Sequence, residues 1–317
     1  MKIIEKYGRD DLATVYLAKT DQGHYIEFVE SLQPPFDRNQ KMVMIISTLL
    51  GCPVSCIMCD AGGSFGGKIS TEDMFAQIDH VVRKRFGGDR IPVAKFKVQF
   101  SRMGEPAYND EVLTVLDEFP ERYDAPGFIP SLSTVGPAGR DNFFKRLLDI
   151  KKRHYPRSFQ LQFSIHSTDI TIRDRIIPIK KMSFQQIADY AERFHDEGGK
   201  KITLNFILAK DFTLDPKAMV ENFSPDLFFI KMTPLNPTYM ANRNQLAPGI
   251  IGKPIESGEG ERILDRIKAE GYEALLSIGE QEENRIGSNC GQFVETYQKA
   301  EIARESLVDS YDTFSYV

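Results

Sequence analysis

The sequence predicts an α/β fold, a partial (β/α)6 barrel that follows a short N-terminal β-hairpin extension. Apolar, β-rich runs recur along the chain, and amphipathic segments of helical length separate them. Such alternation is typical of right-handed βαβ units and a parallel sheet. We count six main strands before the last segment, which is fewer than the eight that a closed barrel requires.

The first elements lead toward a glycine-rich loop. Residues 13–29 predict a hairpin, because two β-rich runs flank the turn signal Asp21-Gln22-Gly23. Residues 42–50, MVMIISTLL, form a continuous apolar run that suits a buried parallel strand. The loop after this run contains four glycines between residues 62 and 67, which would let the backbone wrap around a ligand.

The rest of the chain continues the alternation. Ser70 and the acidic residues after it predict the start of a helix that extends to about residue 86. We expect further strands at 95–100, 127–133, 159–165, 201–208, 227–232 and 272–278. We expect the helices between them at 109–118, 140–153, 183–197, 215–222 and 258–270. The resulting division is a hairpin extension (1–40), a core barrel (41–296) and a C-terminal tail (297–317).

Three of the four cysteines lie in one motif, Cys52-Pro-Val-Ser-Cys56-Ile-Met-Cys59. Thiolates suit iron–sulfur clusters, and three cysteines leave one iron of a four-iron cluster open to a substrate or cosubstrate. The alternatives are a structural zinc site and three unrelated core cysteines. Zinc would require a fourth ligand; Asp60 adjoins the motif, but no histidine lies within twenty residues of it.

Composition indicates a globular protein without a membrane anchor. Of the 317 residues, 41% are hydrophobic and 27% are charged, and no apolar run has the length of a membrane span. The charged N-terminus lacks a signal peptide's apolar region, so we expect a cytoplasmic protein whose clustered cysteines serve metal binding or catalysis. Residues 256–317 hold 14 acidic and 6 basic side chains, and this balance disfavours a large nucleic-acid partner.

Polar and turn-forming residues follow four of the expected strands. These segments are Ser101–Pro106, Ser131–Pro137, Phe163–Ser167 and Thr233–Pro237. Each segment alone could be only turn chemistry. Because ligands of parallel α/β folds bind at the carboxyl ends of the strands, their recurrence at that end favours a ligand site.

With these motifs the chain resembles the RlmN/Cfr family of radical-SAM adenine methyltransferases over roughly residues 13–296. The resemblance implies a radical-SAM core in which Cys52, Cys56 and Cys59 bind a 4Fe–4S cluster. S-adenosylmethionine (SAM) would bind the open iron, and reduction would cleave it to a 5′-deoxyadenosyl radical. The resemblance assigns SAM contacts to Gly104, Glu105, Ser133, Ser164, Ile165, His166 and Asn236.

The fourth cysteine extends the resemblance. Cys290, in Gly-Ser-Asn-Cys-Gly-Gln, matches the cysteine that accepts a methyl group in the family and passes its carbon to the substrate. A lone cysteine is usually a small buried hydrophobe, but these polar neighbours indicate a loop. Glu27 matches the family's proposed proton acceptor, and its alternative is an outward-facing strand carboxylate.

The chain departs from the family at two points. Ile45 stands where the family has the cysteine that releases the product, and we expect no counterpart of the family's N-terminal accessory domain. An S-methylcysteine-dependent methyltransferase is therefore one hypothesis, and direct action of the deoxyadenosyl radical on a small molecule or nucleoside is a second. A third is a non-catalytic cluster-bearing module. The substrate, RNA or a smaller molecule, stays open, and we expect a flavodoxin or ferredoxin as the reductant.

Overall fold

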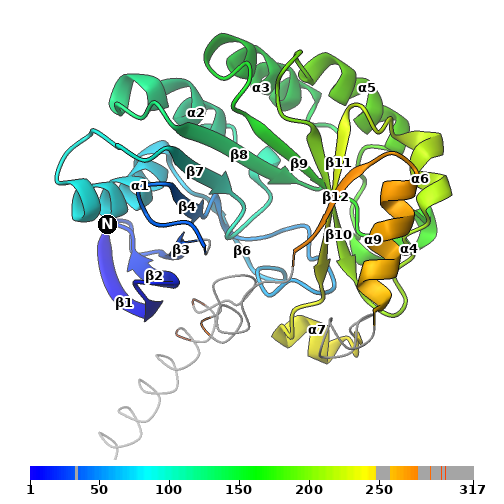
Figure 1. The fold of residues 1–317 in the computed structure, drawn as a ribbon. Coiled ribbons are helices and arrows are strands. Elements are labelled where there is room, and N and C mark those ends of the chain that lie inside the picture. The colour runs from blue at the N-terminus through cyan, green and yellow to red at the C-terminus, as the bar shows by residue number, and fades with distance from the viewer. Residues whose placement is uncertain (33–34, 248–257, 278–285, 287–293, 295–296, 298–317) are drawn as a thin grey trace, which may run out of the picture.

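The protein's structure, a computed structural model, describes residues 1–32, 35–247 and 258–277, together with Ile286, Val294 and Tyr297. Within these ranges, ten strands form one sheet in the order β1-β2-β3-β4-β7-β8-β9-β10-β11-β12 (Figure 1). The described pairings join neighbours in this order and none joins β1 to β12, so the sheet is open.

The elements have the following bounds. The strands are β1 (Lys2–Arg9), β2 (Ala13–Lys19), β3 (Tyr25–Ser31), β4 (Lys41–Ile46), β5 (Leu49–Gly51), β6 (Phe65–Lys68), β7 (Lys95–Phe100), β8 (Phe128–Thr134), β9 (Gln160–Ser164), β10 (Ile202–Leu208), β11 (Phe228–Pro234) and β12 (Glu273–Leu276). The helices are α1 (Thr71–Phe86), α2 (Glu111–Arg122), α3 (Asp141–His154), α4 (Ile170–Ile176), α5 (Phe184–Phe194), α6 (Pro216–Asn222), α7 (Tyr239–Arg243) and α9 (Glu259–Ala269), with a 3-10 turn η1 (Pro106–Tyr108).

The prediction of an α/β fold with a large parallel sheet is confirmed. Among the described strands, β4 and β7 to β12 run parallel to one another. The N-terminal strands β1, β2 and β3 extend this sheet in antiparallel pairings and end against β4. The carboxyl ends of seven parallel strands therefore lie along one edge, where the polar loops follow them.

The apolar run 42–50 is not one strand, and here the prediction was wrong. β4 ends at Ile46, and β5 pairs antiparallel with β6 in a separate two-stranded sheet. The cause is a contact with a distant loop, since the backbone N–H groups of Thr48 and Leu49 donate to Met103 O at 2.9 and 3.0 Å. These bonds turn the chain toward the cysteine motif.

Helix boundaries follow local capping signals where such signals exist. Ser70 accepts a hydrogen bond from Asp73 N at the start of α1, and Gly87 ends the helix in a left-handed conformation. The sequence analysis did not predict α4 and α7. Both are short, and they begin at the capping side chains of Asp169 and Thr238.

The helices cover the outer face of the parallel strands (Figure 1). Phe96, Val98 and Phe100 of β7 are fully buried in one hydrophobic cluster with residues of α1, α2, α3 and α5. Because successive side chains of a strand point to opposite faces, the alternate residues Lys97 and Gln99 lie on the inner face.

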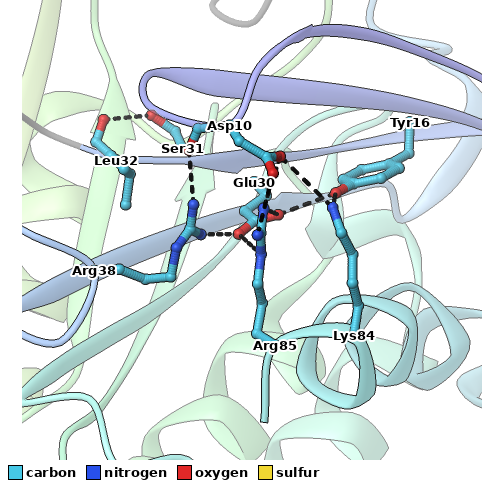
Figure 2. Close-up of polar contacts among 8 residues, drawn as sticks. All are labelled: Asp10, Tyr16, Glu30, Ser31, Leu32, Arg38, Lys84 and Arg85. Atoms are coloured by element: carbon cyan, nitrogen blue, oxygen red, sulfur yellow. Dashed lines mark hydrogen bonds and ion pairs between the residues drawn. The ribbon is translucent and has the colours of Figure 1, made fainter. Parts of the chain in front are cut away.

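A buried carboxylate joins the N-terminal strands to α1 (Figure 2). Glu30 on β3 accepts hydrogen bonds from Arg85 at 2.6 and 2.9 Å and from the Tyr16 hydroxyl at 3.0 Å. Arg38 also pairs with Glu30, and Arg85 reaches Asp10 at 2.9 Å. This charge-paired network ties β3, the strand that also carries Glu27, to α1.

Candidate active site

The cysteine motif occupies a tightly constrained loop between β5 and β6. Gly51 has a φ of 79°, and a Cβ there would lie 1.5 Å from Ser64 O, so only glycine fits. The Cys52 sulfur accepts hydrogen bonds from the backbone N–H groups of Val54, Glu105 and Ser55. Burial raises the pKa of this thiol, whereas these amides lower it by stabilising the thiolate that a metal requires.

The three thiols lie close enough to influence one another. Burial raises the pKa of Cys56 well above its ordinary value, and the neighbouring Cys59 and Cys52 raise it further. No three metal-ligating side chains in the described part of the chain converge on a single ion. Three thiolates suit a four-iron cluster with one open iron, whereas a structural zinc site would need a fourth ligand.

Asp60, the possible fourth zinc ligand, has another role. Its two carboxylate oxygens accept the backbone N–H groups of Tyr239 and Met240 at 3.2 and 2.8 Å, at the start of α7. Thr238 Oγ1 donates to Met58 O at 2.7 Å, and Asn244 Nδ2 donates to Ile57 O at 2.6 Å. The cysteine loop is therefore bonded to the segment that follows Asn236, a contact that the sequence analysis missed.

Glu105 lies beneath the loop that follows β8. Its carboxylate accepts hydrogen bonds from Ala107 N at 3.0 Å, Val135 N at 2.8 Å and the Thr134 hydroxyl. Burial raises its pKa to about 7, against the effect of these bonds. Three of about four acceptor positions are occupied by the protein itself, which leaves one for a ligand cation. The preceding Gly104 packs so closely that a Cβ would lie 2.3 Å from the Leu49 side chain.

The other predicted SAM contacts lie at neighbouring strand ends. Ser133 on β8 accepts a hydrogen bond from Gln99 Nε2 at 3.3 Å, and Ser164 ends β9. Ile165 and His166 follow at once, and both of their amides donate to Asn205 O.

His166 is buried in an uncommon conformation. Its φ of 61° is rare outside glycine, and burial lowers its pKa to about 3, so the ring is neutral. His166 Nδ1 is one of three buried side-chain atoms without a partner among the described residues; the others belong to Arg173. An orphaned ring nitrogen at a strand end fits a site that a ligand completes.

Glu27 is buried, so the outward-facing alternative is wrong. Its side chain is 0% exposed, and Oε1 accepts a hydrogen bond from Arg102 Nε at 2.8 Å. Val294 N donates to Oε2 at 3.1 Å. Glu27 thus binds both the loop after β7 and a residue near the C-terminus. Arg102, which the sequence analysis passed over, is its ion-pair partner.

A cavity of about 350 Å³ lies beside these groups. Residues 23–25, at the turn between β2 and β3, line it on one side, and four residues of the cysteine loop line it on another. These four are Asp60, Ala61, Ser64 and Gly66, and the lining is completed by Leu50, Gly51, Met103 and Val294. Cys290 lies outside the described residues, four positions before Val294 in the sequence. Ile45 is on the inner face of β4, paired in register with Gln99.

No protein-family model matches the chain. The chain is 28% identical over 252 residues to a probable dual-specificity RNA methyltransferase RlmN of Thermotoga petrophila, which covers 75% of this chain and 66% of that protein. It is also 28% identical over 323 residues to a probable RNA methyltransferase of Rhodopirellula baltica, with 96% and 77% covered. The first alignment spans slightly less than two thirds of the relative's length.

The fold matches that of a radical SAM methyltransferase from Sphaerobacter thermophilus. The TM-score is 0.71 at 20% sequence identity, over 92% of this chain and 80% of the other. The structural match shows a shared fold, and the sequence relatives agree with the resemblance to the RlmN/Cfr family that the motifs carry. That class implies a 4Fe–4S cluster and SAM. No helix within the described ranges is long and apolar enough to cross a membrane.

Proposed function

We propose that this RlmN/Cfr-like chain is a radical-SAM methyltransferase that transfers a methyl carbon through Cys290. Cys52, Cys56 and Cys59 would bind one 4Fe–4S cluster, and the amino and carboxylate groups of SAM would occupy its open iron. When bound, the cluster supplies the electron that cleaves SAM to a 5′-deoxyadenosyl radical. A flavodoxin or ferredoxin would deliver that electron.

The observation that carries this proposal is the contact between the cysteine loop and the Gly104–Glu105 segment. The amide of Glu105 donates to the Cys52 sulfur, while the Glu105 carboxylate organises the loop after β8. A proposed cluster ligand and a proposed SAM contact are thus one hydrogen bond apart. The remaining acceptor position on Glu105 suits the SAM ammonium, and His166 Nδ1 suits a polar group of the ribose or adenine.

The roles of Glu27 and Cys290 depend on the segment that contains Val294. Glu27 accepts a hydrogen bond on each oxygen, from Arg102 Nε and from Val294 N, and these two bonds orient its carboxylate. A methyl-carrying cysteine four positions before Val294 would lie on the same segment. We therefore propose that Glu27 and Cys290 act together, because Val294 binds Glu27 and follows Cys290 by four residues in the sequence.

One observation favours a second candidate function, in which the radical acts directly on the substrate. Ile45 occupies the inner face of β4, at the position of the family's releasing cysteine, and it has no thiol. The names of the relatives suggest RNA as the substrate. The acidic balance of residues 256–317 favours a smaller one.

Anaerobic reconstitution tests the first part of the proposal. Wild-type protein should bind four irons per chain and release 5′-deoxyadenosine from SAM under reduction, and Cys59→Ala should lose both. Closure of the site by a fourth protein ligand, or wild-type protein that fails to cleave SAM, would contradict it.

Mass spectrometry of the purified protein separates the two candidate functions. A methyl group on Cys290 supports the methyltransferase. Cys290→Ala should keep the cluster and SAM cleavage but form no methylated product. If Cys290→Ala forms product at the wild-type rate, direct radical action replaces methyl transfer through this cysteine.

A further inference from the structure

The cysteine motif comes close to the protein surface along one stretch. Pro53 and Ser55 are exposed, and Cys56 and Cys59 are partly buried, whereas Cys52 is buried. A cluster bound by these thiols would therefore lie just beneath an exposed part of the loop. Within the described residues, this stretch gives a partner protein a place to approach the thiols.

Two short helices border this stretch. The N–H of Ile57, which stands between Cys56 and Cys59, donates to Ile176 O at the end of α4, at 3.1 Å. The carbonyl oxygen of Ile57 accepts a hydrogen bond from Asn244 Nδ2, just after α7, at 2.6 Å. Because each backbone group of Ile57 is bonded to the end of a different helix, α4 and α7 both end beside the motif.

An exposed arginine precedes each of these two contacts by one residue. Arg175 precedes Ile176 on α4, and Arg243 precedes Asn244 on α7. Lys180, four residues after Ile176, is exposed as well. Among the residues that the structure describes, none of these three cations forms an ion pair with a carboxylate.

The acidic side chains of the same segments are already engaged. Asp174 pairs with Lys181 at 2.6 Å, and Asp169 accepts a hydrogen bond from Ile172 N at 2.9 Å at the start of α4. The carboxylate of Asp60 accepts two backbone N–H groups of α7. The surface around the motif is therefore locally positive, although the whole chain has a net charge of −5.

A positive surface beside a cluster motif suits an acidic partner, because complementary charges steer two proteins together. Proteins that exchange electrons form small interfaces, below about 1,200 Å², and depend on such steering. Nucleic acid usually requires a longer basic stripe that follows its phosphates. Three cations around one short loop therefore favour an acidic electron-carrier protein over RNA.

We propose that Arg175 and Arg243 dock an acidic one-electron carrier protein onto the exposed face of the cysteine loop. Lys180 adds to the positive charge that attracts this carrier. The carrier is oxidised by one electron and the cluster is reduced by one, and no bond is made or broken at this surface. The inference rests on the proposed function, because only a chain that binds the cluster needs this electron.

Binding of an oxidised, FMN-loaded flavodoxin to the oxidised holoprotein tests the inference, since no electron can pass between them. Calorimetry should show that Arg175→Gln with Arg243→Gln weakens binding by about tenfold at about 50 mM salt. This difference should shrink at about 500 mM salt, because salt screens exposed charges. Arg175→Lys with Arg243→Lys keeps both charges and should retain most of the affinity.

The matched control removes two cations from the opposite edge of the sheet. Lys152 and Arg157 are exposed and precede the amino end of β9. Lys152→Gln with Arg157→Gln changes the net charge by the same amount and should alter the affinity less than about twofold. An equal loss in this control would show a general effect of net charge and would overturn the inference.

Three further outcomes decide the assignment. Equal affinities for wild type and Arg175→Gln with Arg243→Gln, or no flavodoxin binding by wild type, would also overturn it. A single-stranded RNA oligonucleotide is the second titrant. If the two glutamine substitutions weaken its binding and leave flavodoxin binding unchanged, the surface contacts RNA and the inference is wrong.

Reduced methyl viologen, a small cation, separates this inference from the proposed function because it needs no docking surface. With this reductant, Arg175→Gln with Arg243→Gln should cleave SAM at the wild-type rate. Protein that cleaves SAM but binds flavodoxin independently of both arginines contradicts this inference alone. Flavodoxin binding that depends on the arginines, in protein that does not cleave SAM, contradicts only the proposed function.

Discussion

Replacing Arg102 by methionine removes the cation that pairs with the buried carboxylate of Glu27. The two side chains are 2% and 0% exposed, and Arg102 Nε lies 2.8 Å from Glu27 Oε1. Loss of one partner leaves the other charge buried, and breaking such a pair costs about 3–5 kcal/mol. We therefore expect Arg102→Met to lower the free energy of unfolding by that amount.

A double-mutant cycle separates the pair from the individual side chains. In Glu27→Gln with Arg102→Met, neither charge remains, and uncharged replacements of a buried pair are often nearly neutral. The double variant should therefore recover on the order of 2 kcal/mol relative to Arg102→Met alone. Arg90→Met is the control, because its ion pair with Asp124 is exposed and should contribute less than about 1 kcal/mol.

The assays are urea unfolding and amide hydrogen exchange. Urea unfolding measures the free energies, and exchange at Val294 measures whether its N–H still donates to Glu27. Loss of the ion pair should speed exchange at Val294. Arg102→Met could instead keep the wild-type free energy of unfolding within about 1 kcal/mol and leave exchange at Val294 unchanged. In that case the ion pair of Glu27 and Arg102 does not stabilise the contact with Val294.

Three further predictions follow from the site. Asp60→Ala removes the two acceptors that hold the start of α7 against the cysteine loop. We expect this contact to lose about 0.5–2 kcal/mol, and the iron content and the affinity for SAM should fall. Glu105 has a folded pKa of about 7, raised by burial, so its contribution to stability is present below about pH 4 and is lost as the pH rises to about 7. Glu105→Gln should remove this pH dependence, which amounts to about 3 kcal/mol at most. Ile45→Cys should give Cys290 a thiol partner and speed product release, as measured by single-turnover kinetics.

Each of these has a result that contradicts it. For Asp60→Ala, the control is Ser64→Ala on the same loop, and equal iron content in both variants would remove the role of Asp60. For Glu105, an identical pH slope in wild type and Glu105→Gln would show that another group titrates. For Ile45→Cys, failure to form a disulfide with Cys290 under oxidation would place them beyond the roughly 7 Å that a disulfide spans between Cα atoms.

Glu105→Ala illustrates how the structure changes an expectation. From the sequence, Glu105 follows an expected strand, and the resemblance gives it only a contact with SAM. The structure instead makes it the acceptor for Thr134, Val135 and Ala107, so its loss also disrupts the loop after β8. A weaker SAM affinity in Glu105→Ala would therefore need a stability measurement beside it.

The polar residues on the inner faces of β7 and β9 could have been predicted from the sequence. The segments KFKVQF and FQLQFS alternate apolar and polar residues with the period of two that one-sided burial produces. This alternation predicts that one face of each strand contacts the helices and that the other face does not. It therefore places Lys97 and Gln99 on the inner face.

Local patterns in the sequence determined the elements whose signals lie within a few residues. The cap at Ser70, the alternation of strands and helices, and the cysteine spacing are of this kind, because capping bonds and periodic burial depend on near neighbours. The tertiary structure alone decided the break in the run 42–50, which requires Met103. It also decided the pairing of Glu27 with Arg102 and the contact of Asp60 with α7, because these groups are 75 and about 180 residues apart in the chain and only the folded sheet brings them together.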